Sequence, residues 1–117
     1  MSLPDESLYR RLVDETFQMI DEAFEDVDPD VVESSFGQGT LTLLFADGKR
    51  CILSPQAPVR QIWVAFKDRA WHMNLDEATG HWVDDRGQRL ELFKLVEDIT
   101  RQATGLEIPI GREQRRE

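Results

Sequence analysis

The N-terminal part of the chain carries apolar residues at three-to-four spacing, which is the period of a helix with one buried face. This stripe comprises Tyr9, Leu12, Val13, Phe17, Ile20, Phe24 and Val27. Ser2 followed by Asp5 resembles a weak capping box. Because proline disfavours the helical conformation of the residue before it, the tripeptide Asp28-Pro29-Asp30 is expected to end the helix. We therefore predict a helix from about Asp5 to about Val27.

After this helix the apolar period changes from 3.6 to 2, which indicates strands that bury one face. The first regular alternation covers Thr40–Phe45. Asp47-Gly48 is a strong hairpin signal, and it leads into a predicted strand over Lys49–Leu53. A further strand is predicted over Gln61–Phe66, with an apolar face of Ile62, Val64 and Phe66. Two more strands are predicted over Trp71–Leu75 and His81–Asp84.

Helical spacing returns near the C-terminus, at Leu92, Phe93, Val96, Ile99 and Ala103. Gly105 is a suitable C-terminal stop, and the apolar segment Leu106–Ile110 is expected to lie against the helices. We predict one domain over residues 1–110 and a polar tail over 111–117. Its fold class is α+β, a two-layer sandwich with the N- and C-terminal helices packed on one face of an antiparallel sheet of about five to six strands. The other sheet face is left open to solvent.

Composition narrows the possible partners. The 117 residues include 23 acidic and 14 basic ones, a formal net charge of -9, which disfavours nucleic acid as a partner because phosphates require a basic face. A single cysteine, Cys51, excludes an intramolecular disulfide and a Cys-rich metal site. No apolar run approaches the roughly 18 residues of a membrane span. Met1–Glu6 lacks the features of a signal peptide, so we expect a soluble, cytoplasmic protein without a membrane partner.

The negative charge is concentrated in one part of the chain. Between Leu12 and Gly48 there is no Lys, Arg or His, whereas acidic and basic residues nearly balance outside this window. The acidic residues in the window are Asp14, Glu15, Asp21, Glu22, Glu25, Asp26, Asp28, Asp30, Glu33 and Asp47. One region therefore dominates the electrostatic character of the molecule.

Part of this window is a candidate metal site, which we call the acidic ridge: Asp21, Glu22, Glu25, Asp26, Asp28, Asp30 and Glu33. On a helix, Asp21 would lie beside Glu25 and Glu22 beside Asp26, and each such i,i+4 pair would cost a few tenths of a kcal/mol. Carboxylates without nearby His or Cys suit hard cations such as magnesium, calcium, manganese and iron. Because such ligands do not converge on an open surface, we expect several sites with affinities on the order of micromolar or weaker. The alternative is a solvated acidic face that promotes solubility.

Conventional catalysis has little support. His72 lies between Trp71 and Met73 in a predicted strand and faces away from both, which favours a surface histidine over a general base. Cys51 is more typical of a small core residue than of a nucleophile. No nucleophile–base pair can be assigned from spacing, so we expect that the protein is not an enzyme.

The open sheet face is the second candidate surface. Trp63 and Gln61 are expected to project there, and an exposed aromatic residue among polar ones is a common interface anchor. The alternative is a tryptophan partly covered by its neighbours. For Trp82, either face of its short strand fits the pattern.

Several segments together carry a family resemblance. After the acidic helix end come Gly39-Thr40-Leu41-Thr42-Leu43, Asp47-Gly48 and the stretch from Gln56-Ala57-Pro58 to Gln61-Ile62-Trp63-Val64-Ala65. Trp82-Val83 then leads to Asp85-Arg86 and ends at Gly87. This pattern, over about Leu8 to Gly105, resembles the frataxin family and in particular its bacterial CyaY branch. The segment Gln-x-Pro-x-x-Gln-Ile-Trp is its most specific part.

The resemblance implies an iron-binding protein of iron–sulfur cluster assembly, a regulator or an iron donor, that binds Fe²⁺ and Fe³⁺ weakly through the acidic ridge. It implies the cysteine desulfurase and the scaffold protein as partners, and the partner-binding residues that correspond by position are Gln56, Gln61 and Trp63, with Trp82 nearby. Ser54-Pro55 replaces the usual Asn-Arg of the family, and Arg69-Ala70 replaces Gly-Gly.

Two alternatives stay open. One is the ferroxidase or iron-storage activity attributed to some relatives, and the other is an acidic interaction module without a physiological metal. We expect a monomer, with an iron-dependent oligomer as the alternative.

Overall fold

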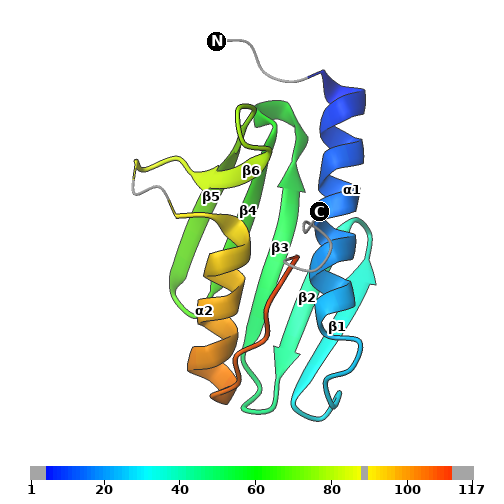
Figure 1. Ribbon diagram of the computed structural model, residues 1–117, viewed down its shortest axis with the longest axis vertical. Coiled ribbons are helices and arrows are strands. Elements are labelled where there is room, and N and C mark those ends of the chain that lie inside the picture. Colours follow the sequence, from blue (N-terminus) through cyan, green and yellow to red (C-terminus); the bar gives the residue numbers. More distant parts are fainter. Residues whose placement is uncertain (1–4, 88–89, 112–117) are drawn as a thin grey trace.

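The computed structural model describes residues 5–87 and 90–111, in which two helices cover one face of a six-stranded sheet (Figure 1). The elements in chain order are α1 (Glu6–Ala23), β1 (Val32–Gly37), β2 (Thr40–Phe45), β3 (Arg50–Gln56), a 3₁₀ turn (Ala57–Val59), β4 (Gln61–Phe66), β5 (Arg69–Asp76), β6 (His81–Asp84) and α2 (Leu92–Thr104). The predicted α+β sandwich is confirmed. The predicted bounds of β2, β4 and β6 also agree with the structure.

Both helices begin at an acidic side chain that accepts backbone hydrogen bonds. Asp5 is the N-cap of α1, where its Oδ2 accepts from the N–H of Leu8 at 3.3 Å. Ser2, the other residue of the predicted capping box, lies outside the described residues. Glu91 is the N-cap of α2 and accepts from two N–H groups of its first turn. These acceptors satisfy donors that the helices leave unpaired.

Helix α1 ends earlier than the sequence predicts, at Ala23 instead of Val27. The N–H groups of Phe24 and Glu25 each bond to the carbonyl three residues back, which tightens the last turn. The Phe24 side chain is buried, and it holds this turn against the core. The apolar period continues past Ala23 because the turn residues also face the core.

The strands form an antiparallel meander in the order β1-β2-β3-β4-β5-β6. Strand β1 was not predicted as a separate element, since Val32 is its one buried residue and the rest alternates weakly. Strand β3 continues to Gln56 instead of Leu53, and β5 covers Arg69–Asp76 instead of Trp71–Leu75. The longer strands widen the open face of the sheet.

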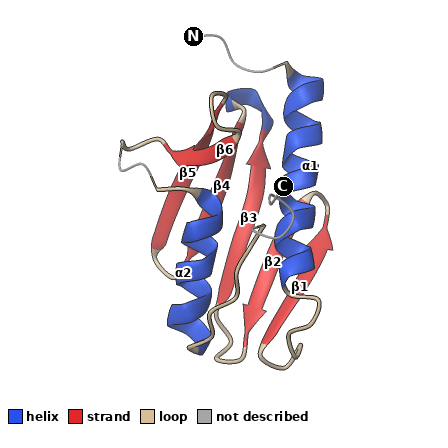
Figure 2. Ribbon diagram, in the orientation of Figure 1, coloured by secondary structure: helices blue, strands red, loops and turns tan. Residues whose placement is uncertain are grey.

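The two helices lie over one face of the sheet (Figure 2), and the core residues are buried between these two layers. The predicted apolar face of β4 is buried there: Ile62, Val64 and Phe66. Cys51 is also a core residue, as expected, and burial raises the pKa of its thiol from 9.0 to about 12. In the described part of the chain neither helix is long and apolar enough to cross a bilayer.

After α2 the chain runs back over the sheet between the two helices (Figure 1). Gly105 ends α2 in the left-handed conformation, with φ 81°. Ile110 is fully buried, and its N–H donates to Oε2 of Glu97 at 2.9 Å, which anchors the segment to α2. Gly111 is buried as well, and the rest of the predicted tail, residues 112–117, lies outside the described residues.

Candidate functional site

The acidic ridge follows the end of α1, the turn after it and the first part of β1. Asp21 and Glu22 are half-buried on α1, and the remaining ridge carboxylates are exposed: Glu25, Asp26, Asp28, Asp30 and Glu33. Because α1 ends at Ala23, Glu25 and Asp26 do not occupy helical i,i+4 positions. The predicted i,i+4 pairs are therefore wrong, and the ridge continues through a turn instead of along a helix face.

The ridge begins at the end of α1 where the helix dipole is negative. Helix α1 has no basic residue in its last turn. A cation at that end is typically stabilising by about 0.3–1 kcal/mol, and an anion is disfavoured there for the same reason. Asp21 and Glu22 therefore occupy positions where the local fold favours Lys or Arg. A positively charged ligand or partner surface would relieve this cost.

Three ridge side chains accept hydrogen bonds from neutral donors: Asp21, Glu22 and Asp28. The Ser34 hydroxyl donates to Oδ1 of Asp21 at 2.6 Å, and the Gln18 side-chain amide donates to Oε2 of Glu22 at 3.2 Å. In the turn after α1, the backbone N–H of Asp30 donates to Oδ1 of Asp28 at 2.9 Å. These bonds orient the carboxylates without cancelling their charge.

The ridge charges stay largely unneutralised. Within residues 5–87 and 90–111, no Lys, Arg or His forms a salt bridge with Asp21, Glu25, Asp26, Asp28, Asp30 or Glu33. On α2 the situation is different, because Asp98 is paired with Lys94 at 3.6 Å and with Arg101 at 3.1 Å. The negative field at the end of α1 is therefore open to a cation or a basic surface from outside.

The ridge does not form a closed metal cage. Among the described residues, no three His, Cys, Asp or Glu side chains lie close enough together to hold a metal ion. Carboxylate oxygens fit a hard cation such as iron, magnesium or calcium. Each ion on the ridge would be held by one or two carboxylates and by water, so the arrangement suits weak, exchangeable association.

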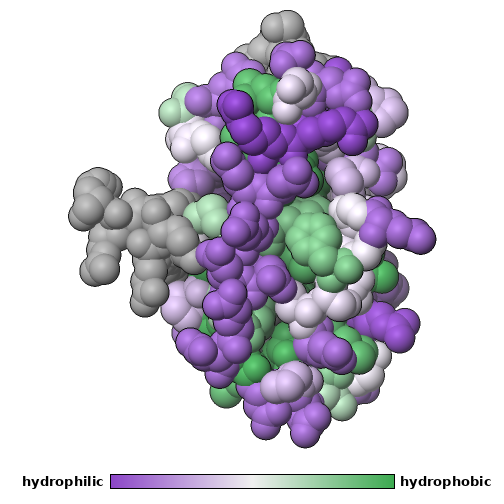
Figure 3. All heavy atoms as spheres, turned by 90° about the vertical axis from the view of Figure 1, so that its right-hand side faces the viewer, coloured by the Kyte–Doolittle hydropathy of each residue, from purple (hydrophilic) through white to green (hydrophobic). Residues whose placement is uncertain are grey.

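The side of the molecule formed by α1 and β1 also has an apolar patch, which hydrophilic side chains border (Figure 3). Phe36 on β1 is 51% exposed, more than the other large apolar side chains of the described residues. Its ring packs against Phe17 of α1, with 5.9 Å between ring centres. The sequence interpretation missed Phe36, because β1 itself was not predicted.

The open face of the sheet carries Trp63, as predicted. Its side chain is 36% exposed and stacks on the His72 ring, with 4.2 Å between ring centres and 14° between planes. The indole Nε1–H donates to Oε1 of Gln61 at 2.7 Å. Trp63 is therefore held on one side by an imidazole ring and at its edge by an amide.

The same amide of Gln61 reaches two further residues. Its Nε2 donates to Oδ1 of Asn74 at 3.1 Å and to Oδ2 of Asp85 at 3.3 Å. This oxygen of Asp85 also lies 3.7 Å from Nδ1 of His72. We call these residues the indole cluster: Gln61, Trp63, His72, Asn74 and Asp85.

The pairing of β4 with β5 explains why four of these residues meet. The register sets Trp63 opposite His72 and Gln61 opposite Asn74. A two-strand alignment of the sequence could have found both pairs, since residues opposite each other share a face. Asp85 follows β6 in a turn, so no strand pattern could have placed it.

Trp82 does not belong to the open face. It is 3% exposed, its Nε1–H donates to the Thr16 hydroxyl of α1 at 3.0 Å, and its ring meets Tyr9 edge-on at 6.1 Å. In the short strand β6 the buried alternation selects the helix side for this residue. The prediction that Trp82 lies near a partner-binding surface is therefore corrected, since its side chain is a core contact between α1 and the sheet.

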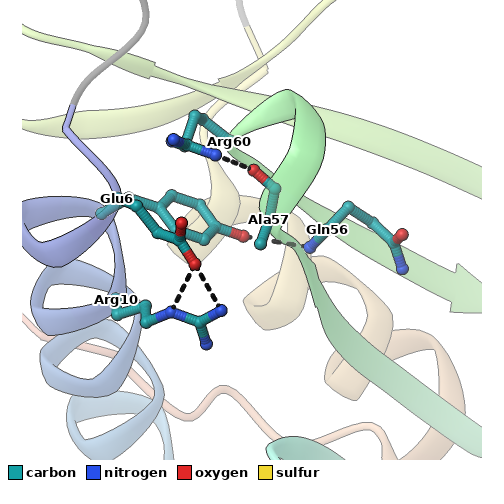
Figure 4. A network of polar contacts seen from close by, with 6 residues as sticks. Glu6, Arg10, Gln56, Ala57 and Arg60 are labelled. Atoms are coloured by element: carbon teal, nitrogen blue, oxygen red, sulfur yellow. Dashed lines mark hydrogen bonds and ion pairs between the residues drawn. The ribbon is translucent and has the colours of Figure 1, made fainter.

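Gln56 lies at the corner where α1 meets the end of β3 (Figure 4). Its backbone N–H donates to the Tyr9 hydroxyl at 3.0 Å, and that hydroxyl donates to the carbonyl of Gln61 at 2.6 Å. Burial raises the pKa of Tyr9 above its ordinary value. At the helix surface, a hydrogen bond from Arg10 holds the pKa of Glu6 below its ordinary value. One buried hydroxyl thus ties α1 to both ends of the segment between Gln56 and Gln61.

The fold and its two surfaces define a small acidic α+β sandwich with a carboxylate-rich end and an aromatic sheet face. A frataxin-like domain matches residues 2–106. The chain therefore belongs to the frataxin family, of the bacterial CyaY type, which confirms the resemblance drawn from its sequence motifs.

Similar proteins support this membership. The iron-sulfur cluster assembly protein CyaY of Tolumonas auensis is 33% identical over 106 residues, covering 91% of this chain and 98% of that protein. CyaY of Pseudomonas aeruginosa is 43% identical over 84 residues, covering 72% and 77%. The solved frataxin of Psychromonas ingrahamii matches with a TM-score of 0.82 at 24% identity, over 91% of this chain and 97% of that one. Trimeric yeast frataxin in complex with ferrous iron matches with a TM-score of 0.59 at 20% identity, over 91% of each chain.

Proposed function

We propose that this protein acts in iron–sulfur cluster assembly, as a regulator or iron donor that binds Fe²⁺ and Fe³⁺ weakly through the acidic ridge. The observation that carries the proposal is that, within residues 5–87 and 90–111, six ridge carboxylates at or after the negative end of α1 form no salt bridge: Asp21, Glu25, Asp26, Asp28, Asp30 and Glu33. The names of the CyaY relatives and the ferrous complex of a family member support it. In this proposal the protein is cytoplasmic and is not an enzyme.

Iron is cargo in this proposal. Hard carboxylate oxygens without thiolate or imidazole partners match Fe²⁺ and Fe³⁺ but do not select strongly against other hard cations. The open arrangement leaves most of the coordination sphere to water, so we expect affinities on the order of micromolar or weaker. Such an ion can be passed on to a partner without breaking a closed site.

The proposed partners are the cysteine desulfurase and the scaffold protein of cluster assembly. The acidic ridge would meet a basic surface through long-range attraction. The face around Gln56, Gln61 and Trp63 would supply a specific contact, with the indole as an aromatic anchor. We propose that the free protein is a monomer.

An anaerobic Fe²⁺ titration followed by amide NMR tests the iron-binding part. We expect signals of residues 21–33 to move and those of the indole cluster to stay. The double variant Glu25→Gln/Asp26→Asn is expected to weaken these shifts. The double variant Asp68→Asn/Glu77→Gln is the control, because it changes the net charge by the same amount at exposed sites outside the ridge. Shifts spread evenly over the molecule, or equal losses in both variants, would contradict ridge binding.

One observation favours a second candidate, an acidic interaction module in which iron is incidental. In the described part of the chain no three potential ligands converge on one point. This candidate requires the desulfurase to bind in the presence of a chelator, with affinity that falls steeply as salt rises. Loss of the complex on chelation would instead favour the iron-dependent function.

The ferroxidase alternative has a direct test. An enzyme of this kind would consume oxygen in a fixed ratio to Fe²⁺, and Glu22→Ala with Asp26→Ala would abolish that consumption. Our proposal expects iron oxidation at the rate of free Fe²⁺ in matched buffer.

A further inference from the structure

The indole of Trp63 is oriented by two neighbours that meet at a single carboxylate. His72 supports the ring face at 4.2 Å, and Gln61 accepts the indole N–H at 2.7 Å. Both neighbours reach Oδ2 of Asp85, Gln61 through its amide at 3.3 Å and His72 through Nδ1 at 3.7 Å. The two supports of the indole therefore share one anchor.

The backbone places Asp85 at this point. Its N–H donates to the carbonyl of His72 at 2.9 Å, which holds the turn after β6 against β5. The side chain is 31% exposed, so it lies at the border of the face and not in the core. Among the described residues no hydrogen bond joins the side chains of Gln61 and His72 directly, so this oxygen of Asp85 is the contact that they share.

We propose that Asp85 is a positioning residue of the docking face: it holds Gln61 and His72, and through them sets the orientation of Trp63 before a partner protein binds. This inference rests on the proposed function, in which the Trp63 face docks the assembly machinery. Ordering an exposed side chain in advance removes a cost that binding would otherwise include. Asp85 thus acts on affinity without forming part of the contact.

The hydrogen bond from Gln61 to Asn74, at 3.1 Å, limits how much partner affinity is lost when Asp85 is replaced. It keeps one support in place when Asp85 is replaced, so the indole is loosened and not released. We expect Asp85→Ala to weaken partner binding by about two- to tenfold, the cost of immobilising one side chain. Asp85→Asn keeps an oxygen that can accept from Gln61 and is expected to restore most of the affinity.

The first measurement uses the free protein. Asp85→Ala is expected to shift the indole N–H signal of Trp63 and to lower its order parameter, with Asp85→Asn in between. Asp68→Ala removes an exposed carboxylate from the turn between β4 and β5 and is the control. An indole signal that is the same in Asp85→Ala and wild type overturns the inference, whatever the partner does.

The second measurement is a double-mutant cycle with the desulfurase or the scaffold protein, whichever binds the wild type. If Asp85 acts through Trp63, replacing Asp85 in a Trp63→Ala background changes affinity no further. An undiminished loss in that background means that Asp85 affects binding by a route other than Trp63, and it overturns the proposed orientation of the indole. Circular dichroism and the melting temperature confirm that each variant is folded.

The two measurements separate this inference from the proposed function. Failure of the wild type to bind either protein contradicts the proposed partners, while the indole signal still decides whether Asp85 orients Trp63. Binding by the wild type with an unchanged indole in Asp85→Ala contradicts the inference alone.

Discussion

The acidic ridge and the indole cluster are built in opposite ways. On the ridge, like charges lie near one another and neutral groups such as the Ser34 hydroxyl supply their hydrogen bonds, so the net negative charge is kept. In the indole cluster, Trp63, Gln61 and Asp85 are bonded in a chain, so their orientations are set within the protein. A field of exposed charge suits exchangeable cations and acts at a distance. An ordered aromatic side chain suits one complementary surface.

The comparison teaches that the two surfaces should respond to different variables. Ridge interactions should weaken with salt, because exposed charges are screened within about 8–10 Å at physiological ionic strength. Contacts of the indole cluster should depend on side-chain geometry and much less on salt. Tyr9, near the start of α1, bonds to the backbone of Gln56 and Gln61, so it ties the helix on which the ridge begins to the strand that carries the indole cluster.

The largest expected effect is a loss of folding stability at high pH that comes from the core residue Cys51. It must be distinguished from the effects of changes on the two surfaces. The pKa of Cys51 is raised from 9.0 to about 12, so the unfolded chain loses this proton first as pH rises. The contribution of the protonated Cys51 thiol to stability is complete below pH 9 and is lost as the pH rises toward 12. The loss is up to about 1.4 kcal/mol per pH unit and about 4 kcal/mol in all.

Urea unfolding at pH 8 and pH 10.5 checks this expectation. Cys51→Ala is expected to be less stable at pH 8, because it leaves a cavity, but to lose less stability on going to high pH. Parallel losses in the variant and the wild type would show that Cys51 does not titrate as its burial requires.

Next in size is the loss of the aromatic anchor. Trp63→Ala is expected to weaken the partner complex by about 2 kcal/mol or more, roughly thirtyfold, while leaving the Fe²⁺ shifts of the ridge unchanged. Phe36→Ala is the matched control, since it removes an exposed aromatic ring from the helix side of the sheet. Isothermal titration calorimetry measures the affinity of both variants for the partner. Equal losses of affinity would contradict the distinction between the two faces.

Tyr9→Phe tests the connection between the regions. It removes the hydroxyl that bridges Gln56 and Gln61, and we expect the free energy of unfolding to fall by about 1–2 kcal/mol. Glu6→Gln breaks a neighbouring exposed contact to Arg10 and is expected to change stability little. Chemical denaturation compares the two. If both variants match the wild type, the Tyr9 hydroxyl does not hold α1 to the sheet.

The smallest effect concerns charge crowding on the ridge. The double variant Glu25→Gln/Asp26→Asn removes two exposed negative charges from the turn after α1. It is expected to raise stability by about a few tenths of a kcal/mol at low ionic strength, and the gain should disappear in high salt. Salt or a divalent cation should raise the melting temperature of the wild type in the same direction. Asp68→Asn with Glu77→Gln is the control. A melting temperature that is insensitive to salt and metal would contradict the crowding argument.

The sequence predicted most of the fold because burial alternates locally along regular elements. The bounds of β4 and the stop at Gly105 follow from patterns within a few residues. Strand β1 escaped prediction, since Val32 is its one buried residue and Ser and Gly make up much of the rest. The end of α1 was misplaced because Phe24 continues the apolar period in a turn.

The candidate surfaces divide in the same way. Charge clustering and the outward face of Trp63 could be predicted, since both follow from residue order and strand parity. The side chosen by Trp82 could not, because a four-residue strand fits either parity and its bond to Thr16 involves a distant helix. The approach of Asp85 to His72 also depends on how a turn folds back on a neighbouring strand.

Local order in the chain thus specifies the layers, the acidic end and the family, because hydrophobic period and residue type act over short distances. Whether the acidic groups find internal cations, and which groups support the indole, depends on contacts between segments far apart in the chain. Those contacts exist only once the sheet has paired and the helices have packed, so they could be seen only in three dimensions.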